Sequence, residues 1–228
     1  MADIKVLSSI ATREAHLELV PKFERDSGHT VVFTWAGTVD IMKRMTAGEV
    51  YDLVMMASRE LDELIKLGKI TAGSRIELAK SGIGVAVRHG APKPDIGSVD
   101  ALKRAVLAAK TVGFTTGPSG VYMGGLMERL GIAAEIKAKF RTVPSGGTIG
   151  TIIASGDCEI GFQQISELVH IKGIDIVGPL PAEVQRITVF AGGCPPGASN
   201  AAAAQALLRF FAAPAAQAEL KKHGLEPA

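Results

Sequence analysis

Short apolar runs alternate with stretches of helical periodicity along nearly the whole chain. The apolar runs predict strands at residues 4–7, 31–34, 53–56, 83–87, 111–114, 159–162, 174–177 and 186–190. The stretches between them predict helices at residues 12–26, 39–47, 60–67, 99–109, 123–130, 148–155, 201–211 and 214–223. In the first of these helices, Leu17, Val20 and Phe23 are spaced as on a packed face. Alternating strands and helices are typical of an α/β fold with mostly parallel sheets.

Small and hydroxyl residues follow the first three predicted strands. Ser8 and Ser9 come after the first, Gly37 and Thr38 after the second, and Ser58 after the third. The carboxyl ends of parallel strands meet at one edge, where open α/β sheets bind ligands. Helices that start at this edge have backbone N–H groups available for an anion. We therefore expect an anion site here, with helix capping as the alternative role of the serines.

A second turn of this kind, Gly-Pro-Ser-Gly at residues 117–120, follows the strand predicted at 111–114. Ser119 and Gly120 stand where the next helix begins, so we predict that both contact the ligand, together with Val121 and Tyr122. A tight turn enforced by the proline is the alternative for the turn itself. Packing under the helix is the alternative for the tyrosine.

The composition narrows the range of partners. The chain has 228 residues, of which 47% are hydrophobic, and can bury one large core or two smaller ones. Its 25 basic and 23 acidic residues are spread without blocks and give a formal net charge of +2. This pattern predicts neither nucleic acid nor an anionic membrane as a partner, and no run reaches the roughly 18 apolar residues of a membrane span. We expect a monomer that carries no cofactor and no metal.

Two questions stay open at this level. The chain starts almost directly on its first strand, without the features of an export signal. The protein is therefore cytoplasmic if Met1 is the native start, and periplasmic if a signal peptide has been removed. The sequence also leaves undecided whether Cys158 and Cys194 form a disulfide. The five histidines are not at metal-ligand spacing, and we expect each of them at the surface.

Six segments, taken in order, resemble the molybdate-binding proteins and the wider group of type II periplasmic solute-binding proteins. They are residues 6–11, 35–38 (Trp-Ala-Gly-Thr), 47–53 (Ala-Gly-Glu-Val-Tyr-Asp-Leu), 118–122 (Pro-Ser-Gly-Val-Tyr), 156–162 (Gly-Asp-Cys-Glu-Ile-Gly-Phe) and 222–225 (Lys-His-Gly-Leu). The resemblance implies two lobes, each a mostly parallel sheet flanked by helices: residues 1–81 with 187–228, and residues 82–186. It also implies a ligand cleft between the lobes, hinge closure near 80–82 and 186–190, and an ABC-type transporter permease as partner.

The same resemblance assigns ligand contacts. The family's binding positions fall, in chain order, on or near Ala11, Thr38, Ser119, Gly146 and Gln164. Ala11 takes the position of a serine that binds the oxyanion in the family. Gln164 lies near the position of the tyrosine that closes the family's oxyanion site. A compact tetrahedral oxyanion favours a ring of donors, whereas Gln164 and its neighbour Gln163 offer donors and acceptors. We therefore predict that a solute-binding protein of this kind captures a small organic carboxylate in preference to molybdate.

Isomerisation of an unsaturated di- or tricarboxylate is the alternative function, because some members of this group are isomerases of compounds such as aconitate. This chemistry needs a base within reach of a substrate carbon and groups that stabilise the developing charge. Four carboxylates are candidates for the base, and the sequence singles out none of them: Glu14, Asp40, Asp52 and Glu167. For Asp52, which precedes a buried strand, an N-cap role or a role in anchoring the loop is favoured.

Overall fold

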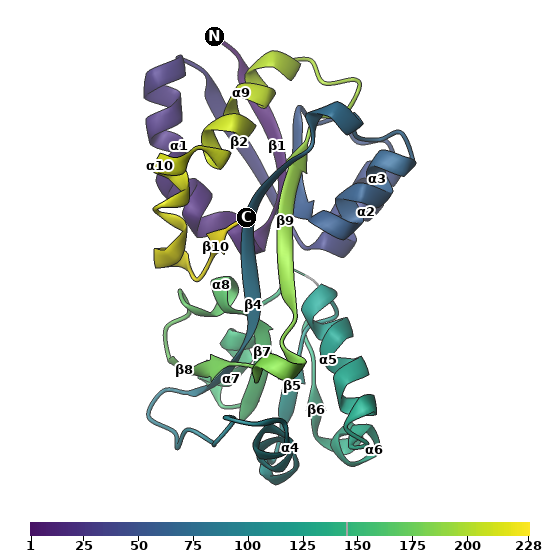
Figure 1. The fold of residues 1–228 in the computed structure, drawn as a ribbon, viewed down its shortest axis with the longest axis vertical. Helices are drawn as coiled ribbons and strands as arrows, with labels where there is room; N and C mark the ends of the chain where they lie inside the picture. The colour runs from purple at the N-terminus through teal and green to yellow at the C-terminus, as the bar shows by residue number, and fades with distance from the viewer. Residues whose placement is uncertain (145) are drawn as a thin grey trace. The chain divides into compact units, whose positions relative to one another are not determined.

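The computed structural model describes residues 1–144 and 146–228, in which strands and helices alternate as in an α/β protein (Figure 1). The chain divides into two units. Unit 1 holds Met1–Lys80 and Thr188–Ala228, and unit 2 holds Ser81–Ile187. The chain leaves unit 1 within strand β4 (Ile76–Arg88) and returns to it at the start of β9 (Ile187–Gly193). Unit 1 is thus built from two separate segments of the sequence.

Unit 1 has its strands in the order β2-β1-β3-β9. Strand β1 runs parallel to β2 and to β3, whereas β9 is antiparallel to β3, and β10 pairs antiparallel with the first part of β4. The other elements of this unit are β1 (Asp3–Ser9), η1 (Ile10–Thr12), α1 (Arg13–Ser27), β2 (Thr30–Ala36), α2 (Thr38–Thr46), β3 (Leu53–Ala57), α3 (Ser58–Lys66), η2 (Ala72–Ser74), α9 (Ala201–Ala212), α10 (Pro214–Gln217), η5 (Leu220–His223) and β10 (Glu226–Pro227). The parallel strands bring the carboxyl ends of β1, β2 and β3 to one edge.

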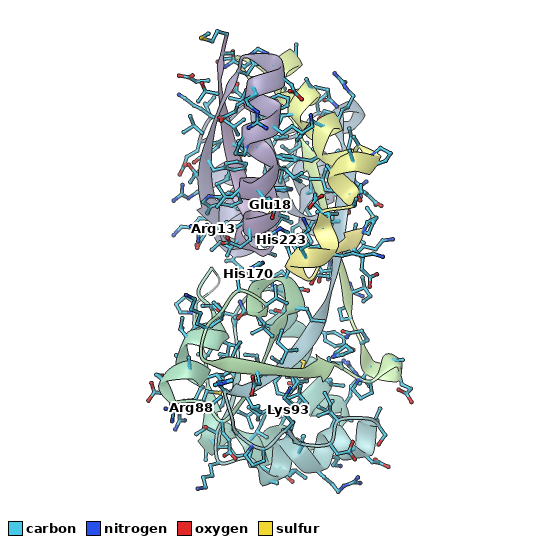
Figure 2. All side chains as sticks on the ribbon, turned by 90° about the vertical axis from the view of Figure 1, so that its left-hand side faces the viewer. Arg13, Glu18, Arg88, Lys93, His170 and His223 are labelled. Atoms are coloured by element: carbon cyan, nitrogen blue, oxygen red, sulfur yellow. The ribbon has the colours of Figure 1, made fainter. Side chains whose placement is uncertain are left out.

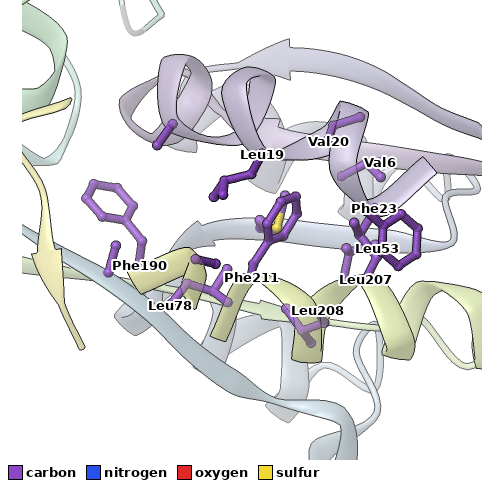
Figure 3. Close-up of a cluster of buried hydrophobic side chains, with 14 of the residues drawn as sticks. Val6, Leu19, Val20, Phe23, Leu53, Leu78, Phe190, Leu207, Leu208 and Phe211 are labelled. Carbon is purple, nitrogen blue, oxygen red and sulfur yellow. The ribbon is translucent and has the colours of Figure 1, made fainter. Parts of the chain in front are cut away.

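Different helices cover the two faces of this sheet. Successive side chains of a strand point to opposite faces. Val6 therefore packs with α1 and α9 in one cluster, and Leu7 packs with α2 and α3 in another. Figure 3 shows the first cluster, in which Phe23 of α1 and Phe211 of α9 are both buried. Burying one such side chain contributes about 1.5–3 kcal/mol, so this cluster ties the two segments of unit 1 together.

Unit 2 has its strands in the order β8-β4-β7-β5-β6, with β5 parallel to both β6 and β7 and β4 antiparallel to β7 and β8. Its other elements are α4 (Val99–Ala108), β5 (Val112–Phe114), α5 (Pro118–Arg129), α6 (Ala133–Ile136), η3 (Lys137–Lys139), β6 (Phe140–Arg141), α7 (Ile149–Ser155), β7 (Ile160–Gln164), α8 (Ile165–Leu168), β8 (Ile174–Pro179) and η4 (Ala182–Val184). Val85 of β4 packs with α4 and α5 on one face, and Ala86 packs with α7 and α8 on the other.

The predicted α/β architecture is confirmed, and each sheet combines parallel strands with antiparallel neighbours. Several boundaries differ from the sequence prediction, and three of them change how a segment is interpreted. Strand β4 is 13 residues long and starts at Ile76, where its residues alternate only partly between apolar and polar. The turn at 117–120 is the start of α5, since proline suits the first position of a helix, where its missing N–H costs nothing. Residues 214–223 form α10 and η5 in place of one helix.

Two predictions about side chains were wrong. Leu17 is 41% exposed, and the packed face of α1 runs through His16, Leu19, Val20 and Phe23. His16 and His223 are buried and are not surface residues. Among the residues that the structure describes, no helix has both the length and the apolar character needed to cross a membrane.

Candidate functional site

The carboxyl edge of unit 1 gathers the predicted ligand residues of the first half of the chain. In the parallel register, Ser9 lies opposite Ala36 of β2, and Ser8 lies opposite Met55 of β3. The strands end together, so Ser8, Ser9 and the starts of α2 and α3 stand at the same edge. This is the arrangement that the sequence predicts for an anion site.

The two adjacent serines at the end of β1 have different roles. Ser9 caps the short helix η1, because its Oγ accepts a hydrogen bond from the Ala11 N–H at 3.3 Å. The capping role is therefore found for this serine. Ser8 is fully buried, and its Oγ has no hydrogen-bond partner among the described residues. A buried hydroxyl without a partner carries an uncompensated free-energy cost, which a bound acceptor would remove.

Helix α2 begins at this edge without a side-chain cap. Gly37 is the capping residue, and Thr38, which is buried, is the first residue of the helix. The first backbone hydrogen bond runs from the Ile41 N–H to the Gly37 carbonyl at 2.9 Å. The N–H groups before Ile41 therefore have no acceptor within the helix. At the start of α3, by contrast, the Ser58 Oγ already accepts a hydrogen bond from Arg75.

The carboxyl edge of unit 2 gathers the predicted residues of the second half. Strands β6, β5 and β7 are parallel neighbours and end at the same edge. The loop after β6 contains Gly146, whose φ is 92°. Helix α5 begins after β5 with Ser119 and Gly120, and β7 ends in Gln163 and Gln164. The structure therefore brings these residues to one edge of unit 2.

The start of α5 offers unused donors. No side chain caps this helix, and its first backbone hydrogen bond runs from the Val121 N–H to the Gly117 carbonyl at 2.9 Å. The N–H groups of Ser119 and Gly120 thus lack an acceptor within the helix. Ser119 is 4% exposed, and its hydroxyl forms no hydrogen bond within the described chain. A Cβ added at Gly120 would lie 1.6 Å from the Thr115 carbonyl oxygen, so the helix can start here only with glycine.

Val121 and Tyr122, the next two predicted ligand residues, do not offer free donors as Ser119 and Gly120 do. Val121 uses its N–H within the helix, and its side chain is 71% exposed. Tyr122 donates its hydroxyl proton to the Val184 carbonyl at 2.8 Å, and the Arg129 guanidinium lies 5.1 Å from the centre of its ring. These contacts favour the alternative in which Tyr122 packs within unit 2, because its hydroxyl proton already has an acceptor in the chain.

Gln163 is held by an extensive set of hydrogen bonds. Its Oε1 accepts from the Ile149 N–H at 2.7 Å and from the Thr148 hydroxyl at 3.3 Å, and its Nε2 donates to the Gly147 carbonyl at 3.2 Å. A further side-chain hydrogen bond joins Gln163 to Glu167. This amide therefore connects the end of β7, the loop after β6 and the carboxyl group on α8. The next residue of β7, Gln164, is also buried.

Glu167 differs from the other three candidate bases. Glu14 lies 3.8 Å from Arg13 with 42% of its side chain exposed, and Asp40 is exposed. Asp52 anchors the chain as predicted, since its carboxylate accepts from the backbone N–H groups of Lys5 at 2.9 Å and Asn200 at 2.8 Å. Burial would raise the pKa of Asp52, yet these hydrogen bonds hold it below its ordinary value.

Burial raises the pKa of Glu167 to about 7, and the hydrogen bond with Gln163 opposes the rise only in part. Its side chain is half-buried, so it keeps some access to solvent. The preceding residue, Ser166, is buried and its Oγ has no hydrogen-bond partner among the described residues. The sequence gives only a weak indication of a role for Ser166 and Glu167, which are the two polar residues within the otherwise apolar segment 165–169.

The two buried histidines of unit 1 lie on α1 (His16) and at the end of η5 (His223). The ring of His16 stacks on Phe211 with centroids 4.1 Å apart, and its Nδ1 has no hydrogen-bond partner among the described residues. Burial, reinforced by His223, lowers the pKa of His16 to about 3. Nε2 of His223 lies 2.9 Å from the Glu18 carboxylate (Figure 2).

Both cysteines are buried free thiols, Cys158 in unit 2 and Cys194 in unit 1. Burial raises the pKa of Cys158 to about 12, which keeps it protonated. Within residues 1–144 and 146–228, no group of three or more histidine, cysteine, aspartate or glutamate side chains is arranged to hold a metal ion.

The profile of the bacterial extracellular solute-binding proteins matches residues 4–226. An aconitate isomerase from Pseudomonas sp. is 34% identical over 230 aligned residues, which cover 98% of this chain and 87% of that protein. A molybdate-binding protein from Azotobacter vinelandii is 25% identical and covers 91% of this chain and 83% of its own length. The solved periplasmic molybdate-binding protein from Azotobacter vinelandii has the same fold, with a TM-score of 0.81 at 19% identity over 97% of this chain and 98% of that one. This chain therefore belongs to the bacterial extracellular solute-binding proteins and is of the molybdate-binding-like type.

Proposed function

We propose that this protein binds a small organic carboxylate through hydroxyl and backbone N–H donors at the carboxyl edges of its sheets. The observation that carries the proposal is the start of α5, where the hydroxyl of Ser119, a residue only 4% exposed, and two backbone N–H groups have no acceptor within the helix. Ser8 and Thr38 are the corresponding groups of unit 1. A carboxylate supplies the acceptors that these donors lack, and the helix dipole favours its negative charge.

The chemistry at two positions, Ala11 and Gln164, supports a carboxylate over molybdate. The N–H of Ala11 is already bonded to Ser9, and its side chain has no hydroxyl to offer an oxyanion. The amide of Gln163 uses its groups within the chain. Gln164 carries an acceptor as well as donors, which suits a ligand that has uncharged or protonated groups besides its carboxylates. The relative that is 34% identical to this chain is named for aconitate, a tricarboxylate.

We further propose that the protein acts as a monomer outside the cytoplasm and delivers its ligand to the permease of an ABC-type transporter. The description of its family as extracellular solute-binding proteins supports this location.

Thermal unfolding of the purified protein with a panel of anions tests the binding proposal. The panel contains succinate, propane-1,2,3-tricarboxylate, trans-aconitate, molybdate and sulfate at matched concentrations. A ligand present at a hundred times its dissociation constant should add about 2.7 kcal/mol to the free energy of unfolding. We expect the carboxylates to give the largest shifts. A larger shift with molybdate would refute the carboxylate preference, and no shift with any anion would refute anion binding.

Isomerisation of an unsaturated di- or tricarboxylate is a second candidate function. The specific observation in its favour is Glu167, a half-buried carboxyl group at the sheet edge of unit 2 whose pKa of about 7 matches the demands of proton transfer near neutral pH. The 34% identity to an aconitate isomerase points in the same direction.

A further inference from the structure

We propose that Glu167 is the catalytic residue that carries a proton between two carbon atoms of a bound, unsaturated di- or tricarboxylate. The inference rests on the second candidate function above. It is drawn from the position of Glu167 directly after β7, next to the parallel strand β5, whose end leads into the uncapped start of α5. A carboxyl group and a set of anion donors thus stand at one edge of unit 2.

The surroundings of Glu167 position its carboxyl group and tune its basicity. Gln163 is fixed by hydrogen bonds to Gly147, Thr148 and Ile149, and it holds Glu167 through its remaining hydrogen-bonding capacity. We assign Gln163 the part of a positioning residue. Burial makes the carboxylate a stronger base than an exposed glutamate, and no charged side chain of the described residues is among the causes of its pKa shift.

The proposed step moves one proton and one double bond. The substrate carries a methylene group between a carboxylate and a carbon–carbon double bond. The Glu167 carboxylate removes a proton from the methylene carbon: the C–H bond breaks, an O–H bond forms, and the electron pair spreads over three carbon atoms and the adjacent carboxylate. Glu167 then returns the proton to the far carbon of this allylic system. The double bond has moved by one position, and no oxidant or reductant is needed.

In this step, the start of α5 stabilises the negative charge that develops on the substrate. Negative charge builds up on the substrate carboxylate as the proton leaves. The N–H groups of Ser119 and Gly120 and the Ser119 hydroxyl are donors without acceptors in the helix, and a group of this kind stabilises developing negative charge. The buried Ser166 hydroxyl, next to Glu167, is a further donor without a partner among the described residues.

The test uses the full chain, trans-aconitate as the reactive probe and propane-1,2,3-tricarboxylate as its saturated, unreactive analogue. Proton NMR in D2O follows deuterium incorporation and isomer formation, and calorimetry measures binding of the analogue. We expect Glu167→Gln to lower the rate of exchange at least 100-fold while it binds the analogue within about threefold of the wild type. The matched control is Glu135→Gln, at an exposed glutamate of the same unit, which should keep both properties.

The outcomes separate the two proposals. If the wild type binds the analogue but neither exchanges nor isomerises trans-aconitate, the role of Glu167 is refuted and the binding function stands. If the wild type binds neither compound, the binding function itself fails. Exchange by Glu167→Gln at the wild-type rate also refutes the role. If this variant does not fold, the wild-type pH profile decides: kcat/KM that rises as the pH is raised through about 7 supports the inference, and a flat profile between pH 6 and 8 refutes it.

Discussion

Burial of His16 predicts a specific loss of stability in mild acid. The ordinary pKa of histidine is 6.5, and burial lowers that of His16 to about 3 in the folded protein. Between these two pH values the unfolded chain binds a proton at this position that the folded chain does not bind. The stabilising effect is therefore complete above pH 6.5 and is lost progressively as the pH falls below it.

The size of this loss in the free energy of unfolding depends almost entirely on how His16 titrates in the unfolded chain. From pH 7 to pH 5 the folded protein stays unprotonated at His16 for any folded-state pKa below about 4. Protonation of the unfolded chain then lowers the free energy of unfolding by about 2 kcal/mol over this range. His16→Phe keeps a ring against Phe211 and removes the titrating group. Any change in packing that it causes affects both pH values, so only the pH dependence reports on the histidine.

Urea unfolding at pH 7 and pH 5 measures this difference. The fluorescence of Trp35, the single tryptophan, reports on unit 1, where His16 lies. Glu167 titrates in the opposite sense, because its raised pKa lets the folded protein hold a proton between about pH 4.5 and 7, but it is present in both proteins. We expect the wild type to lose about 2 kcal/mol more than His16→Phe. Equal losses in the two proteins would refute the reasoning that His16 is kept neutral by burial.

Two further predictions concern the start of α5. Ser119→Ala should weaken carboxylate binding by about 10- to 150-fold in calorimetric titration, the value of one hydrogen bond to a charged group. The melting temperature should change little, because the hydroxyl forms no hydrogen bond with residues 1–144 or 146–228. The exposed Ser155→Ala is its control, and an affinity within twofold of the wild type would remove Ser119 from the site. Gly120→Ala should lower the melting temperature and abolish binding, because its Cβ would collide with backbone. Gly124→Ala, in the same helix, has its nearest neighbour at 3.9 Å and should be neutral or stabilising by up to about 1 kcal/mol; equal melting temperatures for the two variants would contradict the steric argument.

The order of strands and helices and the two polar sheet edges could be predicted because they are local properties. Each predicted strand is a short run rich in apolar residues, and small or hydroxyl residues such as Ser8 and Ser119 follow within a few positions, so the sequence marks both the strand and its carboxyl end. The burial of Glu167 is different, because it depends on which elements pack around α8. The burial of His16 had a signal that was missed: it stands three and four residues before Leu19 and Val20, in line with the apolar stripe of α1.

The partition of unit 1 between two distant segments sets an order of events during synthesis. Unit 2 is continuous in sequence and can complete its core as soon as Ile187 has been made. The first segment of unit 1 must wait, because the cluster that buries Phe23 also needs Phe211, and Asp52 also needs the N–H of Asn200. A nascent or truncated chain that ends before α9 therefore exposes the apolar face of a half-built sheet. The C-terminal segment, Thr188–Ala228, therefore completes unit 1, although the synthesis of this unit starts first. Loss of that segment exposes the N-terminal segment, Met1–Lys80, to aggregation and proteolysis.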